Sequence, residues 1–387
     1  MKLVFVSNYF NHHQKPLSEA FVSYPNIEYT FIETGKISEE RLKLGWGHDQ
    51  KPSYVQNYYQ DEASRLECQR AIDEADIVLW GGAPKELFTQ RLKQRKLTFR
   101  YHERIYKLGY EYHKMPLRVI RHFFMYRLYP SLYLLCASAY AAADFAKTGC
   151  FKGKSYKWGY FTELRRYDNP QKIIESKEKN SIVWVARFLD WKHPEVPIEV
   201  AKRLRADGYD FRIKMIGNGE LMDQIRQIIV ENQLEDSVQM MGSMLPHQVR
   251  DHMEKSEIFL FTSDKYEGWG AVANESMNSC CAVVASHAIG SVPFLIKNGE
   301  NGFIYQDCHI EDAVSKIEWL LDNQEERKLL AQRAYTTIET EWTAAVAVEK
   351  LLTMAEPMLR GEKVNPYADG VCSRGPLLEN NWIIKGK

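Results

Sequence analysis

Short apolar runs and longer amphipathic stretches alternate along the first part of the chain. The runs lack the polar–apolar alternation of a half-exposed strand, which is typical of strands buried on both faces of a parallel sheet. They are residues 2–7, 29–33, 76–80, 97–101 and 134–138. Stretches with helical spacing lie between or after them, at residues 16–22, 64–73, 86–93 and 139–148. Strands that alternate with helices in this way predict a doubly wound parallel sheet.

A second series of the same kind follows a polar segment that contains Pro170. Its apolar runs are residues 181–186, 211–216, 238–241, 258–261 and 282–285. Its helical stretches are residues 194–207, 220–232, 247–254, 310–321, 324–340 and 343–359. We therefore predict an α/β protein with two doubly wound domains that face each other across a cleft. The expected boundaries are a first domain at 1–167, a linker at 168–180, a second domain at 181–359 and a tail at 360–387 that can pack back on the first domain.

Composition agrees with a soluble protein that has ample core. Hydrophobic residues make up 45% and charged residues 26% of 387 positions, and no apolar stretch approaches the roughly 18 residues of a membrane span. The opening residues turn polar too soon for a signal peptide and predict a first strand. Seven cysteines are scattered without metal-ligand spacing, which indicates reduced thiols. We expect a cytoplasmic protein.

Charge is distributed unevenly although the net charge is zero. Residues 85–172 hold 19 Lys and Arg against 6 Asp and Glu, so the rest of the chain is acidic by the same excess of 13. Such a basic region can meet a nucleic acid, an anionic membrane or a phosphorylated substrate. The alternative is an exposed face that the acidic part of the chain balances.

Within this region, residues 110–135 combine aromatic and basic side chains. The set comprises Tyr110, Tyr112, Phe123, Phe124, Tyr126, Tyr129 and Tyr133 among Lys114, Arg118, Arg121 and Arg127. A basic amphipathic helix with aromatics suits a membrane interface. A core helix with a solvated basic face explains the pattern equally well. The sequence leaves open a peripheral contact of this stretch with the anionic inner face of a membrane.

The main candidate for chemistry is the stretch from Glu267 to Glu275. An apolar run leads into it, and its glycines precede a predicted helix, which makes a strand, a glycine loop and a helix N-terminus. Backbone N–H groups at such a junction bind anions, and glycine lets a ligand approach the backbone. We expect phosphate over Gly268, Trp269, Gly270, Ala271 and Val272, and hydroxyl-rich groups near the two carboxylates. The alternative is a helix N-terminal charge at Glu267 and a solvated residue at Glu275.

The first domain offers polar side chains after its first strand. Asn11, His12 and His13 follow that strand, and ligands bind at the carboxyl ends of strands in open α/β sheets. Two adjacent histidines cannot both turn toward one metal ion, so we expect no metal site there. The three side chains are candidates for hydrogen bonds to a donor or an acceptor, or they cap the loop.

Several motifs of the second half occur in the order found in glycosyltransferase family 4. They are Ala186–Lys192 with its Arg187 and Lys192, the glycine turn at Gly217 and Gly219, the strand end Gly242–Met244, the glutamate pair Glu267 and Glu275, and the segments 288–291 and 301–303. The chain resembles this family over about residues 170–355. In the first half, His102 stands where the family has its active-site histidine. The family's glycine pair after the first strand is absent, which leaves contacts from that loop in question.

The resemblance implies a retaining enzyme of GT-B fold, with two Rossmann-like domains, that takes a hexose-type sugar from a nucleotide-diphosphate sugar. Arg187 and Lys192 would stabilise the leaving diphosphate, Glu275 would hold the ribose, and Glu267 and His102 would contact the donor sugar. Gly217, Gly242 and Met244 would lie on the donor side. The acceptor would be a glycan or a lipid-linked glycan of polysaccharide or cell-envelope biosynthesis. The chain has no Asp-x-Asp element, so no metal is expected, and UDP is favoured over GDP.

Three other classes of function remain to be weighed. A sugar-nucleotide epimerase or hydrolase on the same plan would share the phosphate site and would need no acceptor. A dinucleotide enzyme would need Gly-x-Gly-x-x-Gly after the first strand, and residues 7–17 contain no glycine. A nucleic-acid binder is disfavoured because the aromatics of the basic region have apolar helical neighbours rather than a strand-like spacing.

Overall fold

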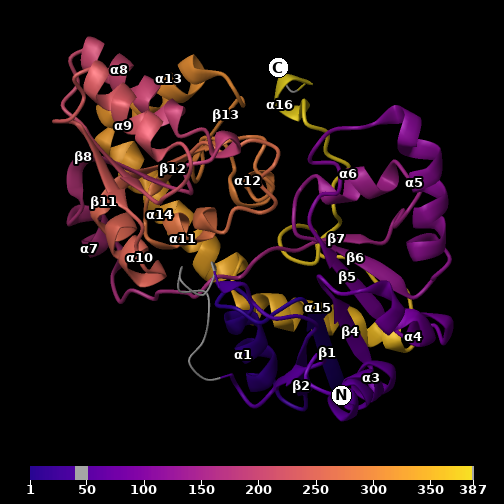
Figure 1. The fold of residues 1–387 in the computed structure, drawn as a ribbon. Coiled ribbons are helices and arrows are strands. Elements are labelled where there is room, and N and C mark those ends of the chain that lie inside the picture. The colour runs from indigo at the N-terminus through magenta and orange to yellow at the C-terminus, as the bar shows by residue number, and fades with distance from the viewer. Residues whose placement is uncertain (40–50, 386–387) are drawn as a thin grey trace. The chain divides into compact units, whose positions relative to one another are not determined.

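A computed structural model describes residues 1–39 and 51–385 of the chain (Figure 1). The described chain forms two compact units. The first unit contains residues 1–162 and 342–379, and the second contains residues 163–341 and 380–387.

The first unit is built on one sheet in which every strand pairs in parallel. Its strands are β1 (Lys2–Ser7), β2 (Glu28–Glu33), β3 (Val55–Asn57), β4 (Ile77–Trp80), β5 (Thr98–His102), β6 (Leu132–Cys136) and β7 (Ser155–Lys157). They lie in the order β3-β2-β1-β4-β5-β6-β7. Since β4 is buried at all four positions, helices must cover the sheet on both faces.

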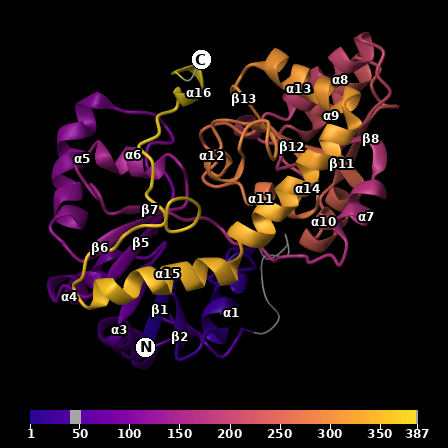
Figure 2. The same cartoon turned by 180° about the vertical axis from the view of Figure 1, so that it is seen from behind.

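Most helices of the first unit lie between its strands, and α15 comes from the C-terminal part of the chain. They are α1 (Lys15–Ser23), α3 (Glu62–Glu74), η1 (Lys85–Phe88), α4 (Thr89–Lys93), η2 (Tyr112–Lys114), α5 (Met115–His122), η3 (Phe123–Arg127), α6 (Ala141–Ala146) and α15 (Ala344–Leu359). Figure 2 shows the long yellow α15 running beside α1. Leu17 and Phe21 of α1 and Leu351 of α15 are buried in the core.

The second unit has a parallel sheet of its own. Its strands are β8 (Glu178–Val185), β9 (Arg212–Ile216), β10 (Val238–Gly242), β11 (Ser256–Phe261), β12 (Ala282–Ser286) and β13 (Phe303–Tyr305), in the order β10-β9-β8-β11-β12-β13. Its helices are α7 (Pro170–Glu175), η4 (Asp190–Lys192), α8 (Glu195–Ala206), α9 (Met222–Glu231), α10 (Pro246–Lys255), α11 (Val272–Asn278), α12 (Val292–Leu295), α13 (Ile310–Asp322), α14 (Gln324–Glu341) and α16 (Trp382–Lys385).

Two layers of helices enclose this second sheet. Apolar side chains of α8, α9 and α13 pack with those of all six strands in one buried cluster that includes Ile182, Ile213, Ile258 and Val284. Helices α10, α11 and α14 contact strands β8, β11 and β12 and one another. The two doubly wound Rossmann-like domains that the apolar runs predict are therefore confirmed. That they face each other across a cleft stays a prediction.

The domain boundaries differ from those expected. Residues 168–180 do not form a free linker, because they contain α7 and the first residues of β8. Pro170 starts α7 rather than breaking the chain, and the Asn169 side chain caps the helix by accepting from Gln171 N at 3.0 Å. Helix α15, which was assigned to the second domain, belongs to the first unit.

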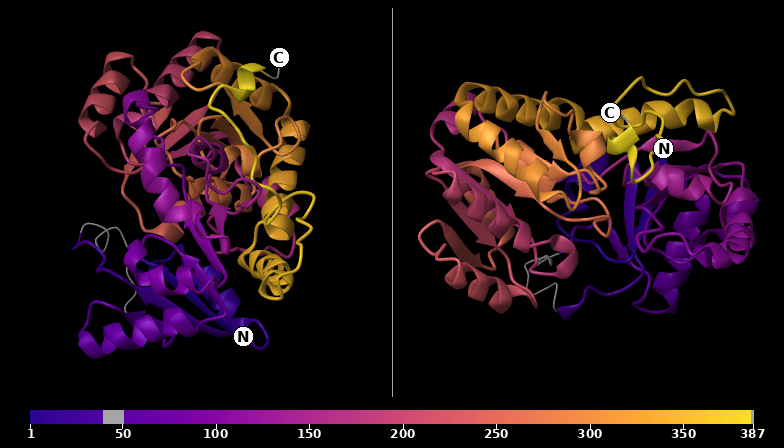
Figure 3. Two further views of the ribbon diagram at one scale, coloured as in Figure 1. Left: turned by 90° about the vertical axis from the view of Figure 1, so that its right-hand side faces the viewer. Right: turned by 90° about the horizontal axis from the view of Figure 1, so that it is seen from above.

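The tail pairs with the edge of the first sheet. Lys157 N donates to Ser373 O at 2.7 Å, and Gly375 N donates to Ser155 O at 2.9 Å. The yellow chain, which Figure 3 shows from two further sides, ends in α16 of the second unit. There Asn380 O accepts a hydrogen bond from His287 Nε2 at 2.8 Å.

Three short strands were not predicted, namely β3, β7 and β13, each of three residues. Among the described helices, none is both long and apolar enough to cross a membrane.

Candidate functional site

The strand order of the second unit points to one place for a ligand. The chain leaves β8 toward β9 on one side and leaves β11 toward β12 on the other. Ligands of open α/β sheets bind where neighbouring connections diverge in this way, outside the carboxyl ends of the strands. The loops that follow β8 and β11 carry four of the predicted site residues, Arg187, Lys192, Glu267 and Gly270.

Lys192 and Glu267 form an ion pair between these two loops. The Lys192 ammonium donates to Glu267 Oε2, and the side chains are only 12% and 11% exposed. The same ammonium lies 4.2 Å from the centre of the Trp191 ring. Thus the structure brings together two residues that were predicted as catalytic, 75 positions apart in the chain.

Hydrogen bonds from the residues directly after β11 hold the backbone around this pair. Thr262 Oγ1 donates to Lys192 O at 2.6 Å and accepts from the buried Trp184 indole at 2.8 Å. Asp264 N donates to Trp191 O at 3.1 Å. These bonds tie the loop after β8 to the loop after β11, so the positions of the lysine and glutamate backbones are set before any ligand arrives.

Gly217 serves the packing of two loops against each other. Its φ is +144°, and a Cβ there would lie 1.9 Å from Ala186 O. Its N–H donates to Gly242 O at 2.9 Å, and Phe188 N donates to Asn218 O at 3.0 Å. The glycine therefore lets the strand ends of β8, β9 and β10 meet, which holds the Arg187 loop in place.

Arg187 and Gly242 present accessible groups at this edge. The Arg187 side chain is exposed, directly after β8. At Gly242, with φ of +71°, no described atom lies within 4 Å of the position that a Cβ would take. Met244, two residues on, is half-buried. A ligand could approach the Gly242 backbone closely, and the resemblance implies that this backbone lies on the donor side.

The loop between the two glutamates is packed into the core. Trp269 is 1% exposed, and its indole donates to Asn274 Oδ1 at 2.8 Å. Gly270 has φ of +84°, and a Cβ there would lie 2.6 Å from the Phe261 ring. The Trp269 side chain is thus a core residue, and only its backbone can serve the donor contact that was predicted. Ala271 and Val272 lie at the start of α11.

Glu275 lies on the first turn of α11 and is half-buried. Among the described residues, none donates a hydrogen bond to its carboxylate. Burial raises the pKa of Glu275, the nearby charges of Arg250 and Arg165 lower it, and Glu163 raises it. A carboxylate with spare acceptor capacity in such a place is suited to ligand hydroxyl groups.

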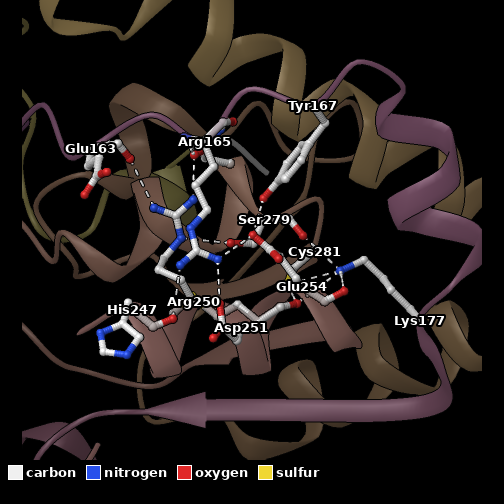
Figure 4. Close-up of polar contacts among 12 residues, drawn as sticks. Glu163, Arg165, Tyr167, Lys177, His247, Arg250, Asp251, Glu254, Ser279 and Cys281 are labelled. Carbon is white, nitrogen blue, oxygen red and sulfur yellow. Dashed lines mark hydrogen bonds and ion pairs between the residues drawn. The ribbon is translucent and has the colours of Figure 1, made fainter. Parts of the chain in front are cut away.

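A polar network positions α11 and with it Glu275 (Figure 4). The buried Arg250 guanidinium donates to Asn278 Oδ1 at 2.6 Å and to Ser279 Oγ at 3.0 Å. Asn278 also accepts from Arg165 N at 2.8 Å and donates to Arg165 O at 3.0 Å. These bonds join α10, the end of α11 and the chain that enters the second unit.

Lys177 supports the same helices at their carboxyl ends. Its ammonium is buried and donates to four backbone carbonyls, those of Met253, Glu254, Ser256 and Ser279, at 2.9–3.1 Å (Figure 4). The last carbonyls of a helix have no partner within it, and a cation there also interacts favourably with the helix dipole. Neither Arg250 nor Lys177 was singled out from the sequence.

In the first unit, His102 is the last residue of β5. Its Nδ1 lies 2.7 Å from Glu103 O. Burial, and after it the nearby Arg100 charge, lowers the pKa of His102 to about 3. The imidazole is therefore neutral near pH 7. Because the Glu103 carbonyl can only accept, Nδ1 carries the proton, and Nε2 is available as an acceptor.

The loop after β1 is ordered by its own side chains. Asn11 is buried, and its Oδ1 accepts from His13 N at 2.9 Å, so Asn11 caps the loop. The ring centres of His12 and His13 are 3.9 Å apart. Burial lowers the pKa of His13 to about 3, and His12 contributes to the shift. The two rings are therefore in contact at an interplanar angle of 44°, and the His13 imidazole is uncharged near pH 7.

A charged histidine next to Lys192 was missed. His193 Nδ1 lies 2.7 Å from Glu195 Oε1, and Nε2 lies 3.6 Å from Asp264 Oδ2. The bonds to Asp264 and Glu195 raise the pKa of His193 to about 10, although burial lowers it. His193 is therefore an imidazolium that holds two carboxylates beside the Lys192–Glu267 pair.

The same histidine belongs to the one group of potential metal ligands among the described residues, with Asp307 and Cys308. Their ligand atoms lie within 4.8 Å of one another. A metal would have to displace the proton that Asp264 and Glu195 hold on His193, since only a neutral imidazole nitrogen coordinates a metal. The donor set therefore does not fit a resident metal ion at neutral pH.

The raised pKa predicts how stability depends on pH. A group whose pKa is higher in the folded state stabilises the fold fully below its unfolded value near 6.5, and this contribution is lost as the pH rises through about 10. We expect His193→Gln to be less stable than the parent at pH 6. The difference should shrink by up to about 1.4 kcal/mol per pH unit above pH 6.5.

Urea unfolding of the parent and of His193→Gln between pH 6 and pH 10 measures this difference. The exposed His247, replaced by Gln, is the matched control and should show a constant, small difference. A gap between parent and His193→Gln that stays constant over this range would show that His193 is not charged in the fold.

Comparison with known proteins finds a family model that matches part of this chain. Residues 166–337 match the family model described as glycosyl transferases group 1. The chain is 26% identical over 180 residues to the amylovoran biosynthesis glycosyltransferase AmsK of Erwinia amylovora, covering 45% of this chain and 44% of AmsK.

A second relative comes from Campylobacter jejuni. It is named N-acetylgalactosamine-N,N'-diacetylbacillosaminyl-diphospho-undecaprenol 4-alpha-N-acetylgalactosaminyltransferase and is 27% identical over 169 residues, 43% of this chain and 44% of the relative. The chain spans from 34% to 54% of the length of the curated relatives that it matches first.

Among solved structures, Alr3699/HepE of Anabaena in complex with UDP and glucose has a TM-score of 0.64 and 13% identity, over 91% of this chain and 99% of HepE. At this identity the likeness concerns the fold alone, and the fold is that of the GT-B glycosyltransferases. Residues 166–337, which make up most of the second unit, are therefore a domain of the glycosyl transferases group 1 type within a GT-B fold.

Proposed function

We propose that the protein is a retaining glycosyltransferase that moves a hexose-type sugar from a nucleotide-diphosphate sugar to a glycan or a lipid-linked glycan. The observation that carries this proposal is the Lys192–Glu267 pair at the divergence of β8 and β11, within residues 166–337. An acid that can bind a sugar and a cation that can bind a phosphate stand side by side there.

The diphosphate of the donor is assigned to Arg187 and Lys192. Guanidinium matches phosphate oxygens with a planar fork, and ammonium acts as a compact point charge. Backbone amides from Gly268 to Val272 supplement them. Because Lys192 already contacts Glu267, a bound diphosphate would share the ammonium with the carboxylate, which would draw phosphate and sugar to neighbouring positions.

The two glutamates take the hydroxyl groups of the donor. Glu275 is assigned to the ribose, since its carboxylate accepts no hydrogen bond from the described residues and lies near Arg250 and Arg165. Glu267 is assigned to the transferred sugar. Gly217, Gly242 and Met244 complete the donor side, with the Gly242 backbone facing open space where a base could lie.

In the reaction, the bond between the sugar C1 and the diphosphate oxygen breaks, and a bond from C1 to the acceptor oxygen forms. The acceptor proton passes to the leaving phosphate, which departs as the nucleoside diphosphate. Negative charge develops on the leaving group, where the fixed cations Arg187 and Lys192 stabilise it. Attack on the face that the phosphate leaves would retain the configuration, so no protein nucleophile is assigned.

The first unit supplies neutral hydrogen-bonding groups to this proposal. His102 is kept as a contact for the donor sugar, and its low pKa makes that contact a hydrogen bond rather than a charge. Asn11, His12 and His13 are kept as contacts on the acceptor or donor side. Asn11 can take part only beyond its loop bond to His13 N.

Donor and acceptor are proposed from chemistry together with the relatives. The cations present can neutralise a diphosphate, so the proposed transfer is independent of metal. UDP is favoured over GDP, in keeping with the structure of HepE with UDP and glucose. The names of AmsK and of the Campylobacter relative support an acceptor of polysaccharide or lipid-linked type. A cytoplasmic location at the inner face of a membrane fits such an acceptor.

The diphosphate assignment predicts a selective loss of affinity. Arg187→Met and Lys192→Met should each weaken binding of UDP by about tenfold or more, because a charge-assisted bond contributes roughly 1.5–3 kcal/mol. Binding of uridine, which has no phosphate, should change little. Titration calorimetry without metal measures both ligands, and Arg226→Met, at an exposed arginine on α9, is the control. An equal loss for UDP and uridine would refute the assignment.

The ribose assignment predicts a loss of discrimination. The parent should bind UDP more tightly than 2′-deoxy-UDP by about tenfold, because a carboxylate that accepts from a hydroxyl loses that bond. Glu275→Gln should bind the two ligands with closer affinities. If the ratio of the two dissociation constants is the same in parent and variant, Glu275 does not contact the ribose.

The proposed transfer of a sugar to an acceptor predicts that release of UDP from a UDP-sugar depends on the presence of that acceptor. We expect little UDP from UDP-glucose or UDP-N-acetylglucosamine alone, and at least about tenfold more after a bacterial membrane-lipid extract is added. Lys192→Met should abolish the increase. Fast release without the extract would identify a hydrolase, and a new epimer of the UDP-sugar without release would identify an epimerase.

A further inference from the structure

The exposed apolar side chains of the first unit gather on one segment. Of the 16 large hydrophobic residues that are exposed among the described residues, eight lie between positions 108 and 128. They are Leu108, Tyr112, Leu117, Val119, Ile120, Phe123, Phe124 and Leu128. Single exposed apolar residues are ordinary on a protein surface, but a contiguous group marks a contact surface.

This segment is helical from η2 through α5 to η3, residues 112–127. Ile120 follows Leu117 by three residues on α5, and Phe124 follows Ile120 by four residues in the π-helical η3, so the three fall on one face of the segment. Tyr126 falls on the opposite face and is buried, so the stripe of three points away from the core. Figure 1 shows α5 as a peripheral element of the first unit. Nothing within the described part of that unit covers the stripe.

Cations border the stripe. Residues 107–128 contain Lys107, Lys114, Arg118, Arg121 and Arg127 but only one acidic residue, Glu111. Glu111 pairs with Lys114 and Arg118, which leaves the segment clearly positive. Arg121 is exposed and belongs to the same face as the stripe.

A basic pocket opens beside this helix. It has a volume of about 540 Å³, and its lining includes Lys85, Arg100 and Arg121 together with the apolar Trp80, Phe124 and Met125. Glu86 is the one acidic residue in the lining. Arg100 is buried and is fixed by a hydrogen bond to Trp80 O at 2.9 Å, with its guanidinium 4.6 Å from the Trp80 ring centre. Lys85 donates to Phe124 O at 2.9 Å, which joins the pocket to the helix.

The combination of apolar and basic side chains indicates which kind of partner binds this surface. A second copy docking here about a two-fold axis would bring two positive segments together, which is unfavourable. A nucleic acid would leave the aliphatic Leu117 and Ile120 without partners, since bases stack on aromatic rings. An anionic bilayer matches both the apolar stripe and the cations beside it. Its acyl region accommodates the apolar side chains, and its phosphate groups bind the cations.

We propose that the helical segment 112–127 of the first unit lies in the interface of an anionic membrane, with the phosphate of one lipid headgroup in the pocket formed by Lys85, Arg100 and Arg121. The stripe of Leu117, Ile120 and Phe124 enters the acyl boundary. The proposal adopts the membrane-interface interpretation, one of the two that the sequence leaves open for residues 110–135. It acts independently of the transfer reaction, so each can fail without the other.

Flotation of the full chain with lipid vesicles tests the proposal. We expect binding to vesicles of phosphatidylcholine with roughly one-third phosphatidylglycerol and little binding to phosphatidylcholine alone. Replacing Leu117 and Phe124 together by Ser should reduce the partition coefficient by at least about tenfold. Arg121→Gln should reduce it by roughly fivefold. Both changes are at exposed positions and should leave the fold intact.

Two controls keep the result specific. Leu66→Ser changes a leucine of α3 that is 63% exposed in the same unit, and it should bind vesicles like the parent. UDP affinity, measured on every variant, should be unchanged. The proposal is overturned if the parent does not float with anionic vesicles, or if the Leu117 and Phe124 double variant floats as well as the parent. It is also overturned if the stripe instead forms a dimer, seen as a parent of twice the mass of the double variant.

Discussion

The ion pair between Lys192 and Glu267 is the contact on which the proposed chemistry depends, and it is costly to build. Two charges that are nearly nine-tenths buried have lost most of their hydration, so their attraction compensates only if the geometry is fixed. The fold fixes it through backbone contacts rather than through the pair itself. Thr262 and Asp264 tie the loop after β11 to the loop after β8, and Gly217 lets the neighbouring strand ends approach to contact. A parallel sheet is what brings these loops to one edge, since all its strands end on the same side.

Much of this could be predicted from the sequence because the signals are local. Each apolar run of four to six residues became a strand. Arg187, Lys192 and Glu267 follow such runs directly, and Glu275 lies on the first turn of the next helix, α11. Elements with little local signal were missed. β3, β7 and β13 are three residues long, too short for a periodic pattern. Helix α15 was correctly expected as a helix but assigned to the wrong domain, because an amphipathic pattern does not tell which sheet the apolar face will cover.

The supporting groups of the site were missed for a related reason. Lys177 and Arg250 act through carbonyls and side chains that lie 28 to 102 positions away along the chain, and nothing next to them in the sequence marks them as buried. A lysine in a polar segment is normally exposed, yet Lys177 is where two helices end and unpaired carbonyls need a donor. Trp269 shows the converse case. It stands inside the motif whose backbone was expected to bind phosphate, and its side chain, for which the motif predicts no role, anchors the loop in the core.

The charge states of the histidines separate the tasks of the two units. In the second unit, Asp264 and Glu195 hold His193 as a cation, and the adjacent Lys192 and Arg187 add fixed positive charge where a diphosphate is proposed to bind. In the first unit, burial keeps His102 and His13 neutral. A neutral imidazole can form a hydrogen bond with a sugar hydroxyl, and because it is uncharged it does not compete with the cations for phosphate. Histidine is thus charged in one unit and neutral in the other. Two carboxylates raise the pKa of His193, whereas burial lowers the pKa of His102 and His13. A protein that must hold a charged leaving group and neutral sugars needs both environments.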